Sequence, residues 1–144
     1  MFKHILIPTD GSALAEAAVH AGIQFCKETG ARATVVTVTL PFPNSPLSGF
    51  AGDTRGMYEA GMRLESDARL ARAKDIARAA GVPCEVRSHH DWHPFQAIVQ
   101  AAASEKCDAI FMASHGRRGL TGFLLGSETQ KVLTHTTLPV VVYR

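Results

Sequence analysis

The chain has 144 residues, of which 46% are hydrophobic and 19% charged, and this composition is typical of a folded globular protein. The length predicts one domain over residues 1–144 that buries its core without disulfides or metals. A formal net charge of +2 gives little electrostatic attraction for nucleic acid, so we expect no nucleic-acid partner.

The sequence lacks the patterns of a secreted or membrane protein. Its apolar segments are shorter than the roughly 20 residues of a membrane span, and its N-terminus has no signal-peptide pattern. Three widely spaced cysteines form no C-x-x-C pair, which favours reduced, buried thiols over a disulfide framework or a zinc site; they are Cys26, Cys84 and Cys107. We therefore expect a cytoplasmic protein that does not bind membranes.

The first half of the chain predicts a strand, a helix, a second strand and a long irregular segment. Residues 2–7 form an apolar run that indicates a strand. Helical spacing over 12–29, followed by a glycine, predicts a helix, and the β-branched run 34–38 predicts a central strand. Residues 40–56 contain three prolines and three glycines, which is typical of a functional lid or a mobile segment.

The second half continues this alternation. The longest helical pattern covers 57–80, and Glu65 and Arg69 are predicted as an i,i+4 ion pair on its solvent side. Its packed side is predicted to carry Met57, Leu64, Ala68, Ala71 and Ile76. The remaining predicted elements are an edge strand at 84–88, a helix at 94–104, a strand at 108–112, a helix at 127–134 and a strand at 139–143.

This alternation predicts an α/β fold. Right-handed crossovers give a doubly wound, five-stranded parallel sheet with helices on both faces. In the strand order 3-2-1-4-5, the order reverses between the first and fourth strands, and ligands bind beyond the carboxyl ends of the strands at that point. Residues 8–12 and the glycine-rich residues 113–127 meet there, so Asp10 is predicted to lie beside the glycine-rich loop.

The glycine-rich loop predicts a site for a phosphorylated ligand. It follows a predicted strand and leads into a helix with Ser127 as its predicted N-cap. Glycine lets backbone N–H groups approach a ligand, and a helix N-terminus supplies unpaired donors and partial positive charge. Arg117 and Arg118 add full charges, although either arginine would also suit a solvated surface position.

Several common templates do not fit this loop. Walker A needs a lysine after Gly126, and G-x-G-x-x-G is absent. Ser114 belongs to half of a G-x-S-x-G elbow, but no helix follows it directly and only Glu128 and His135 remain as partners, so a serine hydrolase is a weaker alternative. Because no catalytic base is identified, we expect a switch or sensor rather than a dedicated enzyme, with slow ATP hydrolysis or phosphotransfer left open.

The pattern Ala113-x-x-Gly116, nine residues, then Gly126-Ser127 resembles the G-x-x-G-x9-G-[ST] nucleotide loop of the universal stress protein family. Residues 3–12 and 138–142 are similar to the family's start and end, so the resemblance covers essentially the whole chain. It implies an adenine nucleotide alpha hydrolase-like fold and a nucleotide-dependent switch in the stress response that binds ATP or another adenine nucleotide, with or without Mg. It also implies a homodimer through strand 139–143, whose apolar edge needs a cover.

The resemblance also implies roles for individual residues. Asp10 would contact the ribose or a metal-bound water, Val38 would offer backbone groups to the adenine edge, and Met112 and Ala113 would flank the sugar. The phosphates would be lined by Gly116, Gly126, Ser127, Glu128 and Thr129. The expected site is completed by Pro8, Thr9, His115 and Arg117. Mg would be held through the phosphates near Asp10 rather than by protein ligands alone.

Two of these assignments have alternatives. Ala113 stands where the family has its first glycine, and its methyl group would crowd the ligand if the position needs a positive φ or close backbone approach. The chain would then be a dimeric interaction or signalling protein of the same fold that binds no nucleotide. Asp10, for its part, would serve only as the N-cap of the first helix.

The segment from His89 to His93 contains three imidazoles and the Asp91 carboxylate, a set that suits a transition metal. It follows the predicted edge strand, about 10 Å and two strand spacings from the crevice. Capping of the helix at 94–104 by Asp91 or His93 is the simpler interpretation, and we expect no metal site here.

Overall fold

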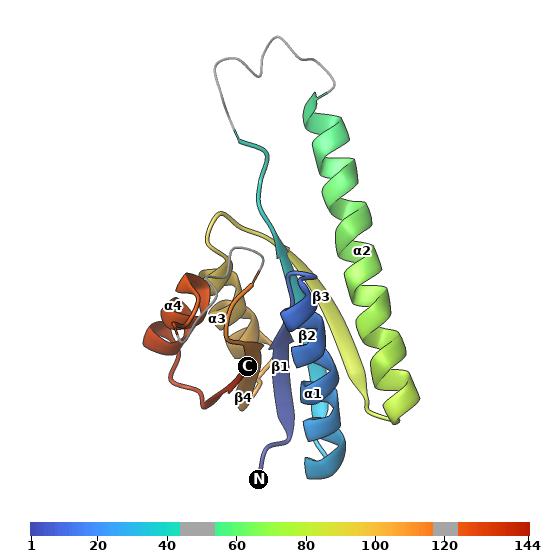
Figure 1. Cartoon of the computed structure of the whole chain (residues 1–144), viewed down its shortest axis with the longest axis vertical. Coiled ribbons are helices and arrows are strands. Elements are labelled where there is room, and N and C mark those ends of the chain that lie inside the picture. The colour runs from blue at the N-terminus through green and yellow to red at the C-terminus, as the bar shows by residue number, and fades with distance from the viewer. Residues whose placement is uncertain (44–53, 117–123) are drawn as a thin grey trace.

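The computed structural model describes residues 1–43, 54–116 and 124–144. Strands and helices alternate along these residues (Figure 1). The strands are β1 (His4–Pro8), β2 (Arg32–Thr39), β3 (Cys84–His90), β4 (Ala109–Ala113) and β5 (Val140–Tyr143). The helices are α1 (Ala13–Thr29), α2 (Thr54–Ala80), α3 (Pro94–Ser104) and α4 (Ser127–His135).

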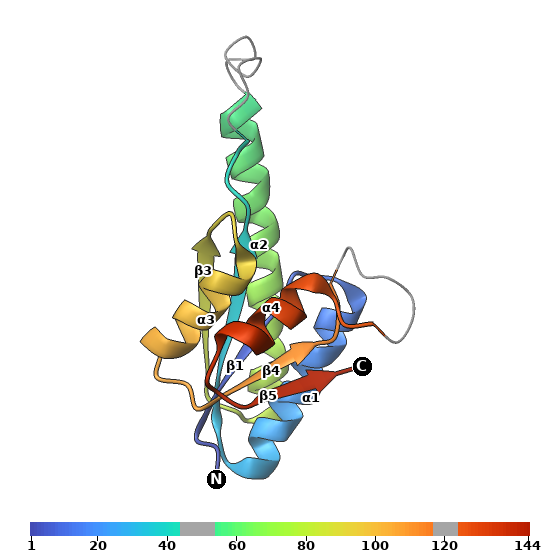
Figure 2. The same cartoon turned by 90° about the vertical axis from the view of Figure 1, so that its left-hand side faces the viewer.

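The five strands form one parallel sheet in the order β3-β2-β1-β4-β5, which confirms the predicted α/β fold and strand order. α1 and α2 cover one face of the sheet, and α3 and α4 cover the other (Figures 1 and 2). Because the order reverses between β1 and β4, the carboxyl ends of these two strands lie side by side. This is the place where a doubly wound sheet binds its ligands.

Each face of the sheet has its own hydrophobic core, since successive strand residues point to opposite faces. In β1, Ile5 and Ile7 pack under α1 and α2, whereas Leu6 packs under α3 and α4. Cys26 and Cys107 lie in these cores, where burial raises the pKa of each thiol to about 12. All three cysteines are unpaired; Cys26 and Cys107 are buried as predicted, whereas Cys84 is only half-buried.

The helix ends exclude Asp10 as the N-cap of α1 and correct the predicted N-cap of α4. Ser12 is the N-cap of α1, with its Oγ accepting from the Ala15 N–H at 3.2 Å, so Asp10 does not cap this helix. The prediction that Ser127 caps α4 is wrong. Gly126 holds the N-cap position with an extended backbone, and Ser127 is the first helical residue.

The helix α2 is longer than predicted and packs through a different face. It begins at Thr54, inside the segment predicted to be irregular, and its buried residues are Ser66, Leu70, Ala73 and Ala77. Of the residues predicted on the packed side, Met57 and Leu64 are 74% and 73% exposed. Ala68 and Ala71 are also exposed, whereas Ile76 packs against the core as predicted. The first half of this helix extends past the sheet (Figure 1), so the apolar spacing there marks no core face.

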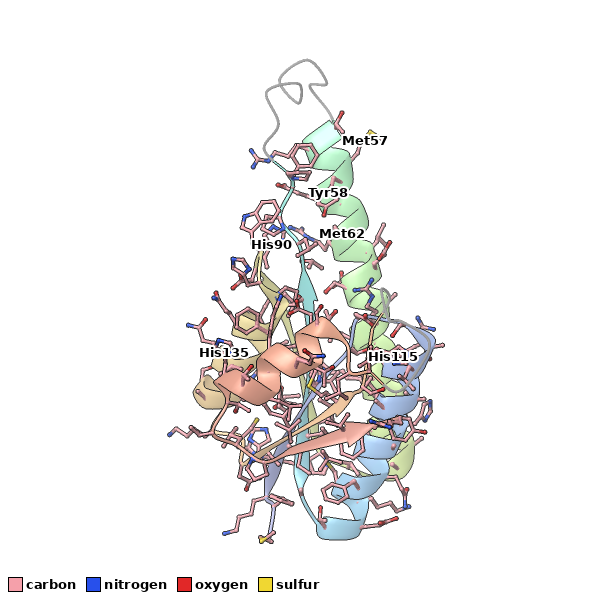
Figure 3. All side chains as sticks on the ribbon, turned by 60° about the vertical axis from the view of Figure 1, so that its left-hand side comes forward. Met57, Tyr58, Met62, His90, His115 and His135 are labelled. Carbon is pink, nitrogen blue, oxygen red and sulfur yellow. The ribbon has the colours of Figure 1, made fainter. Side chains whose placement is uncertain are left out.

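Residues 40–43 run beside the free end of α2. The Tyr58 O–H donates to the Leu40 carbonyl at 3.0 Å, and the Tyr58 and Phe42 rings meet edge-on with centroids 5.4 Å apart. Figure 3 shows Met57 and Tyr58 at this end of α2, away from His115. The rest of the predicted lid, residues 44–53, lies outside the described residues.

Within the three described ranges, no helix has the length and hydrophobicity needed to cross a membrane.

Candidate functional site

The ends of β1, β2 and β4 form one edge of the sheet. Pro8 of β1 lies opposite Val36 of β2, so residues 37–39 extend past the end of β1. The Thr9 N–H donates to the Val36 carbonyl at 2.8 Å and holds the start of the β1–α1 loop against β2. This edge brings together six residues of the predicted site: Pro8, Thr9, Asp10, Val38, Met112 and Ala113.

Asp10 is oriented by its own loop. Its Oδ1 accepts from the Ser12 N–H at 2.9 Å, and the Thr9 Oγ1 accepts from the Gly11 N–H at 3.2 Å. Gly11 between them has a φ of 78°, a left-handed conformation that favours glycine. These hydrogen bonds within the loop fix the orientation of the Asp10 carboxylate.

Gly116, at the start of the glycine-rich loop, lies directly against this carboxylate. A β-carbon built on Gly116 would collide with Oδ2 of Asp10 and lie 3.2 Å from its carboxyl carbon. Gly116 does not have a positive φ, so glycine is required here for close approach rather than for an unusual backbone conformation. The two loops that the topology predicted to meet are therefore in contact at this point.

Gly126, at the start of α4, lies against the residues that follow β4. The Gly126 N–H donates to the Ser114 carbonyl at 2.8 Å, and a β-carbon on Gly126 would lie 3.0 Å from Cα of His115. The Gln130 N–H donates to the Gly126 carbonyl as the first turn of α4 closes. The preceding backbone amides have no acceptor within the helix and carry its partial positive charge; they belong to Ser127, Glu128 and Thr129.

Two side chains in the first turn of α4 form hydrogen bonds to the backbone of β4 and α3. The Thr129 hydroxyl donates to the Ala113 carbonyl at 3.0 Å, and Oε2 of Glu128 accepts from the Phe95 N–H at 2.9 Å. The contribution left for Glu128 in the candidate site is therefore its backbone amide.

The weaker hydrolase alternative loses its proposed partners in this arrangement. The Ser114 hydroxyl lies 3.2 Å from Nδ1 of the adjacent His115, which Figure 3 labels. Glu128 is bonded to α3, and Nδ1 of His135 lies 2.7 Å from the Lys131 carbonyl oxygen. Neither of the two partners that the sequence offered is hydrogen-bonded to Ser114.

Ala113 occupies its position without the conformational freedom of glycine. It is the last residue of β4, and Lys106 is the only non-glycine residue with a positive φ among the described residues. The Ala113 methyl group packs in the core under α1 with Phe111, while its carbonyl accepts from Thr129. An extended backbone and a buried methyl group remove one reason to expect that alanine closes the site.

Val38 lies where β2 continues past its neighbour. The Val36 carbonyl bonds to β1 at Thr9, and the Thr39 carbonyl accepts from Asp91 on the β3 side. Because backbone groups alternate between the two neighbouring strands, the N–H and C=O of Val38 point to the β1 side, beyond the last residue of β1.

Arg69 stands differently from its predicted place, whereas Arg117 and Arg118 lie outside the described residues. Arg69 forms the predicted ion pair with Glu65, with 2.7 Å between Nη2 and Oε2, but its side chain is only 9% exposed. It lies against Gly11 of the β1–α1 loop, so sequence analysis missed a residue at the edge of the candidate site. An i,i+4 pair gave no signal of this, since such pairs are typical of helix surfaces.

The histidine-rich segment forms no metal site in the described part of the chain, where no three His, Cys, Asp or Glu side chains come together. His93 holds the N-cap position of α3 without a side-chain bond, and Oδ1 of Asp91 accepts from the His93 N–H at 2.8 Å. A hollow of about 350 Å³ lies beside this segment, lined among others by His89 and Gln100. It lies at the sheet edge, away from the ends of β1 and β4.

Comparison with known proteins identifies the family to which the chain belongs. The model of the universal stress protein family matches residues 1–144. The chain belongs to the universal stress protein family. The universal stress protein in the QAH/OAS sulfhydrylase 3' region of Thermus aquaticus is 33% identical over 148 residues, which cover 100% of both chains.

Solved structures of universal stress proteins have the same fold. MJ0577 of Methanocaldococcus jannaschii has a TM-score of 0.82 and 26% identity, over 99% of this chain and 96% of that chain. A universal stress protein in complex with cAMP has a TM-score of 0.73 and 25% identity, over 99% of this chain and 97% of that one.

Proposed function

We propose that this universal stress protein binds an adenine nucleotide, with ATP as its ligand, in the crevice between β1 and β4. In this proposal it acts in the cytoplasm as a nucleotide-dependent switch of the stress response. The observation that carries it is the contact of Gly116 with the Asp10 carboxylate beside the N-terminus of α4. The cAMP complex of a related protein supports adenine nucleotides as the ligand class.

The first turn of α4 would bind the phosphates. Its leading amides have no acceptor within the helix, and the helix dipole favours an anion at this end. The Gly126 N–H bonds to the Ser114 carbonyl at 2.8 Å, and a β-carbon at this position would crowd His115. Position 126 therefore has little room for a side chain that would cover these amides. Arg117 would add a full positive charge from the loop.

The adenosine half would lie along the β1–β2 side. The N–H and C=O of Val38 point past the end of β1, and this donor and acceptor pair suits the edge of adenine. Asp10 would accept from ribose hydroxyls through the carboxylate that its loop directs. Met112 and Ala113, at the end of β4, would flank the sugar.

Magnesium would reach the site with the nucleotide. Because no three ligating side chains gather among the described residues, we propose that Mg is held by the phosphates, with Asp10 contacting a metal-bound water. A fast ATPase also needs a group that orients the attacking water. We therefore propose that binding and release, rather than rapid turnover, form the functional event.

We also propose a homodimer through β5. This strand is the last in the sheet, and the Pro139 and Tyr143 carbonyls are among the groups that bond it to β4. The N–H and C=O groups of Val140 and Val142 therefore point to the open edge. Pairing with the same strand of a second copy would satisfy them.

Equilibrium titration with a fluorescent ATP analogue, with and without Mg, tests the proposed function. The wild-type protein should bind saturably, and Gly126→Asp should raise Kd at least about tenfold, because its carboxylate would repel phosphate and crowd His115. Aspartate is itself a good N-cap, so α4 should still form. Gly61→Asp is the matched control, since it adds the same charge on α2 with nothing within 4 Å.

No saturable binding by the wild-type protein up to millimolar nucleotide would contradict the proposal. It would favour instead the dimeric interaction protein that binds no nucleotide. Equal binding by Gly126→Asp and wild type would show that the phosphates do not lie at α4.

A further inference from the structure

Arg69 reaches from α2 to the edge of the candidate site. Its Nη2 pairs with Glu65 at 2.7 Å, and its Nη1 donates to the Thr37 hydroxyl of β2 at 3.4 Å. Thr37 is fully buried, and the Arg69 side chain is 9% exposed. A guanidinium held this deeply between two polar partners differs from an ordinary surface charge, which keeps most of its hydration.

The same side chain lies flat against the β1–α1 loop. A β-carbon built on Gly11 would lie 2.6 Å from Nε and 3.0 Å from Cδ of Arg69. A gap of about 10 Å³, about the size of one water molecule, lies beside this contact and is lined among others by Thr9 and Arg72. The short distances from Gly11 show that the loop packs directly on Arg69.

We propose that Arg69 is a positioning residue for the adenosine half of the nucleotide site, an inference that rests on the proposed function. By contacting Gly11 and Thr37 together, it sets the spacing between the β1–α1 loop and the end of β2. That spacing separates Asp10, next to Gly11, from Val38, next to Thr37. These are the two residues proposed to meet the ribose and the adenine.

Lysine cannot replace arginine in this role. Two nitrogens of the planar guanidinium reach Glu65 and Thr37 while its stem lies on Gly11, and a single ammonium lacks that fork. Arg69→Lys should therefore lose affinity almost as Arg69→Met does.

The test compares ATP with adenosine as competitors of the fluorescent ATP analogue. Arg69→Met should weaken both ligands by the same factor, at least about tenfold, since a lost charge-assisted hydrogen bond has about this effect. Arg72→Met is the matched control, because Arg72 lies one turn further along α2 with 59% of its side chain exposed and should bind as wild type does. Gly126→Asp should weaken ATP far more than adenosine, which separates positioning from phosphate recognition.

A double-mutant cycle with Asp10→Asn tests the link to the loop. If Arg69 acts through the position of Asp10, the double variant should bind little worse than Asp10→Asn alone, whereas a general loss of stability would multiply the two effects. If Arg69→Met does not fold by circular dichroism, Thr37→Val replaces it, since it removes the hydroxyl that Arg69 contacts on β2.

Several outcomes would overturn the inference. Wild-type affinity in a folded Arg69→Met or Thr37→Val would do so, as would a loss confined to ATP, which would make Arg69 a phosphate contact. Wild-type protein that binds neither ligand would contradict the proposed function itself.

Discussion

Gly11 and Gly116 contact the same small region for different physical reasons. Gly11 needs its hydrogen side chain for a φ of 78°, whereas Gly116 needs it to admit the Asp10 carboxylate. The sequence marks both positions as glycine and predicts, through topology, that their loops meet. Which atom lies against each glycine depends on where neighbouring side chains are placed in the fold, and the spacing of residues in the sequence does not predict this.

Gly116→Ala should weaken nucleotide binding. The added methyl collides with Oδ2 of Asp10, so one of the two loops must move, and overpacking of this kind costs about 1–3 kcal/mol. We expect Kd for the ATP analogue to rise about tenfold or more. Gly61→Ala is the control, because a methyl at Gly61 meets nothing within 4 Å and should leave Kd unchanged. Wild-type affinity in Gly116→Ala would show that the contact between Gly116 and Asp10 is not needed for nucleotide binding.

His4 should make folding stability depend on pH. It is 4% exposed, Nε2 lies 2.7 Å from the Thr34 hydroxyl oxygen, and Nδ1 is buried with no hydrogen-bond partner in the described structure. Burial, and secondarily the charge of Arg32, lower the pKa of His4 below its ordinary value of 6.5. The unfolded chain therefore binds a proton first as the pH falls.

The His4 contribution to stability is complete above pH 6.5 and is lost as the pH falls from there through the lowered folded-state pKa. Urea unfolding of the wild type at a series of pH values from neutral downward should show this decline. In His4→Phe the decline over the same range should be shallower. Identical pH profiles for the two proteins would show that another group is responsible.

At the scale of elements, the sequence predicts well where neighbouring residues decide the structure. Ser12 and Gly30 mark the ends of α1, as their chemistry indicates. The predicted packed face of α2 was wrong at Met57 and Leu64, which have helical spacing but lie where the helix extends past the sheet, whereas Ile76 packs against the core as predicted. Arg69 was predicted to lie in solvent but is buried, because tertiary packing brings the β1–α1 loop onto it. The helical spacing of the sequence gives no sign of that contact.

Two leucines of α2 provide a direct check of its packed face. Leu70 is 8% exposed and belongs to the core under α1 and α2, so Leu70→Ala should lower the free energy of unfolding by about 2–5 kcal/mol. Leu64→Ala, at 73% exposure, should change it by no more than about 0.5 kcal/mol. Chemical denaturation of both variants measures the difference. A larger loss for Leu64→Ala would mean that the first half of α2 is covered in solution.

At the scale of the whole molecule, strand order is the feature that assembles the candidate site. The loops after β1 and β4 are about 100 residues apart in sequence, and the reversal of order brings them together. Sequence patterns predicted this arrangement because each strand and crossover follows general rules of handedness. The cap at Gly126 and the bond from Glu128 to Phe95 were not predictable, since both depend on how α4 sits against the sheet and α3.

The proposed dimer has a variant suited to its geometry. Val142→Pro removes an N–H that points to the open edge of β5 while sparing the bonds that hold β5 to β4. Sedimentation at micromolar concentration should give a dimer for the wild type and a monomer for Val142→Pro, with circular dichroism confirming that the variant is folded. A wild-type monomer, or a dimer that survives in the folded variant, would place any interface elsewhere.

The central claim is that an adenine nucleotide binds at the carboxyl ends of β1 and β4, and amide chemical shifts of the ¹⁵N-labelled protein test it most directly. As ATP is added, the amides of Val38, Gly116 and Ser127 should shift together and saturate. Those of Glu85 in the edge strand β3 and Tyr58 at the free end of α2 should stay in place. The absence of saturating shifts up to millimolar ATP, or shifts confined to the hollow beside His89, would contradict the account.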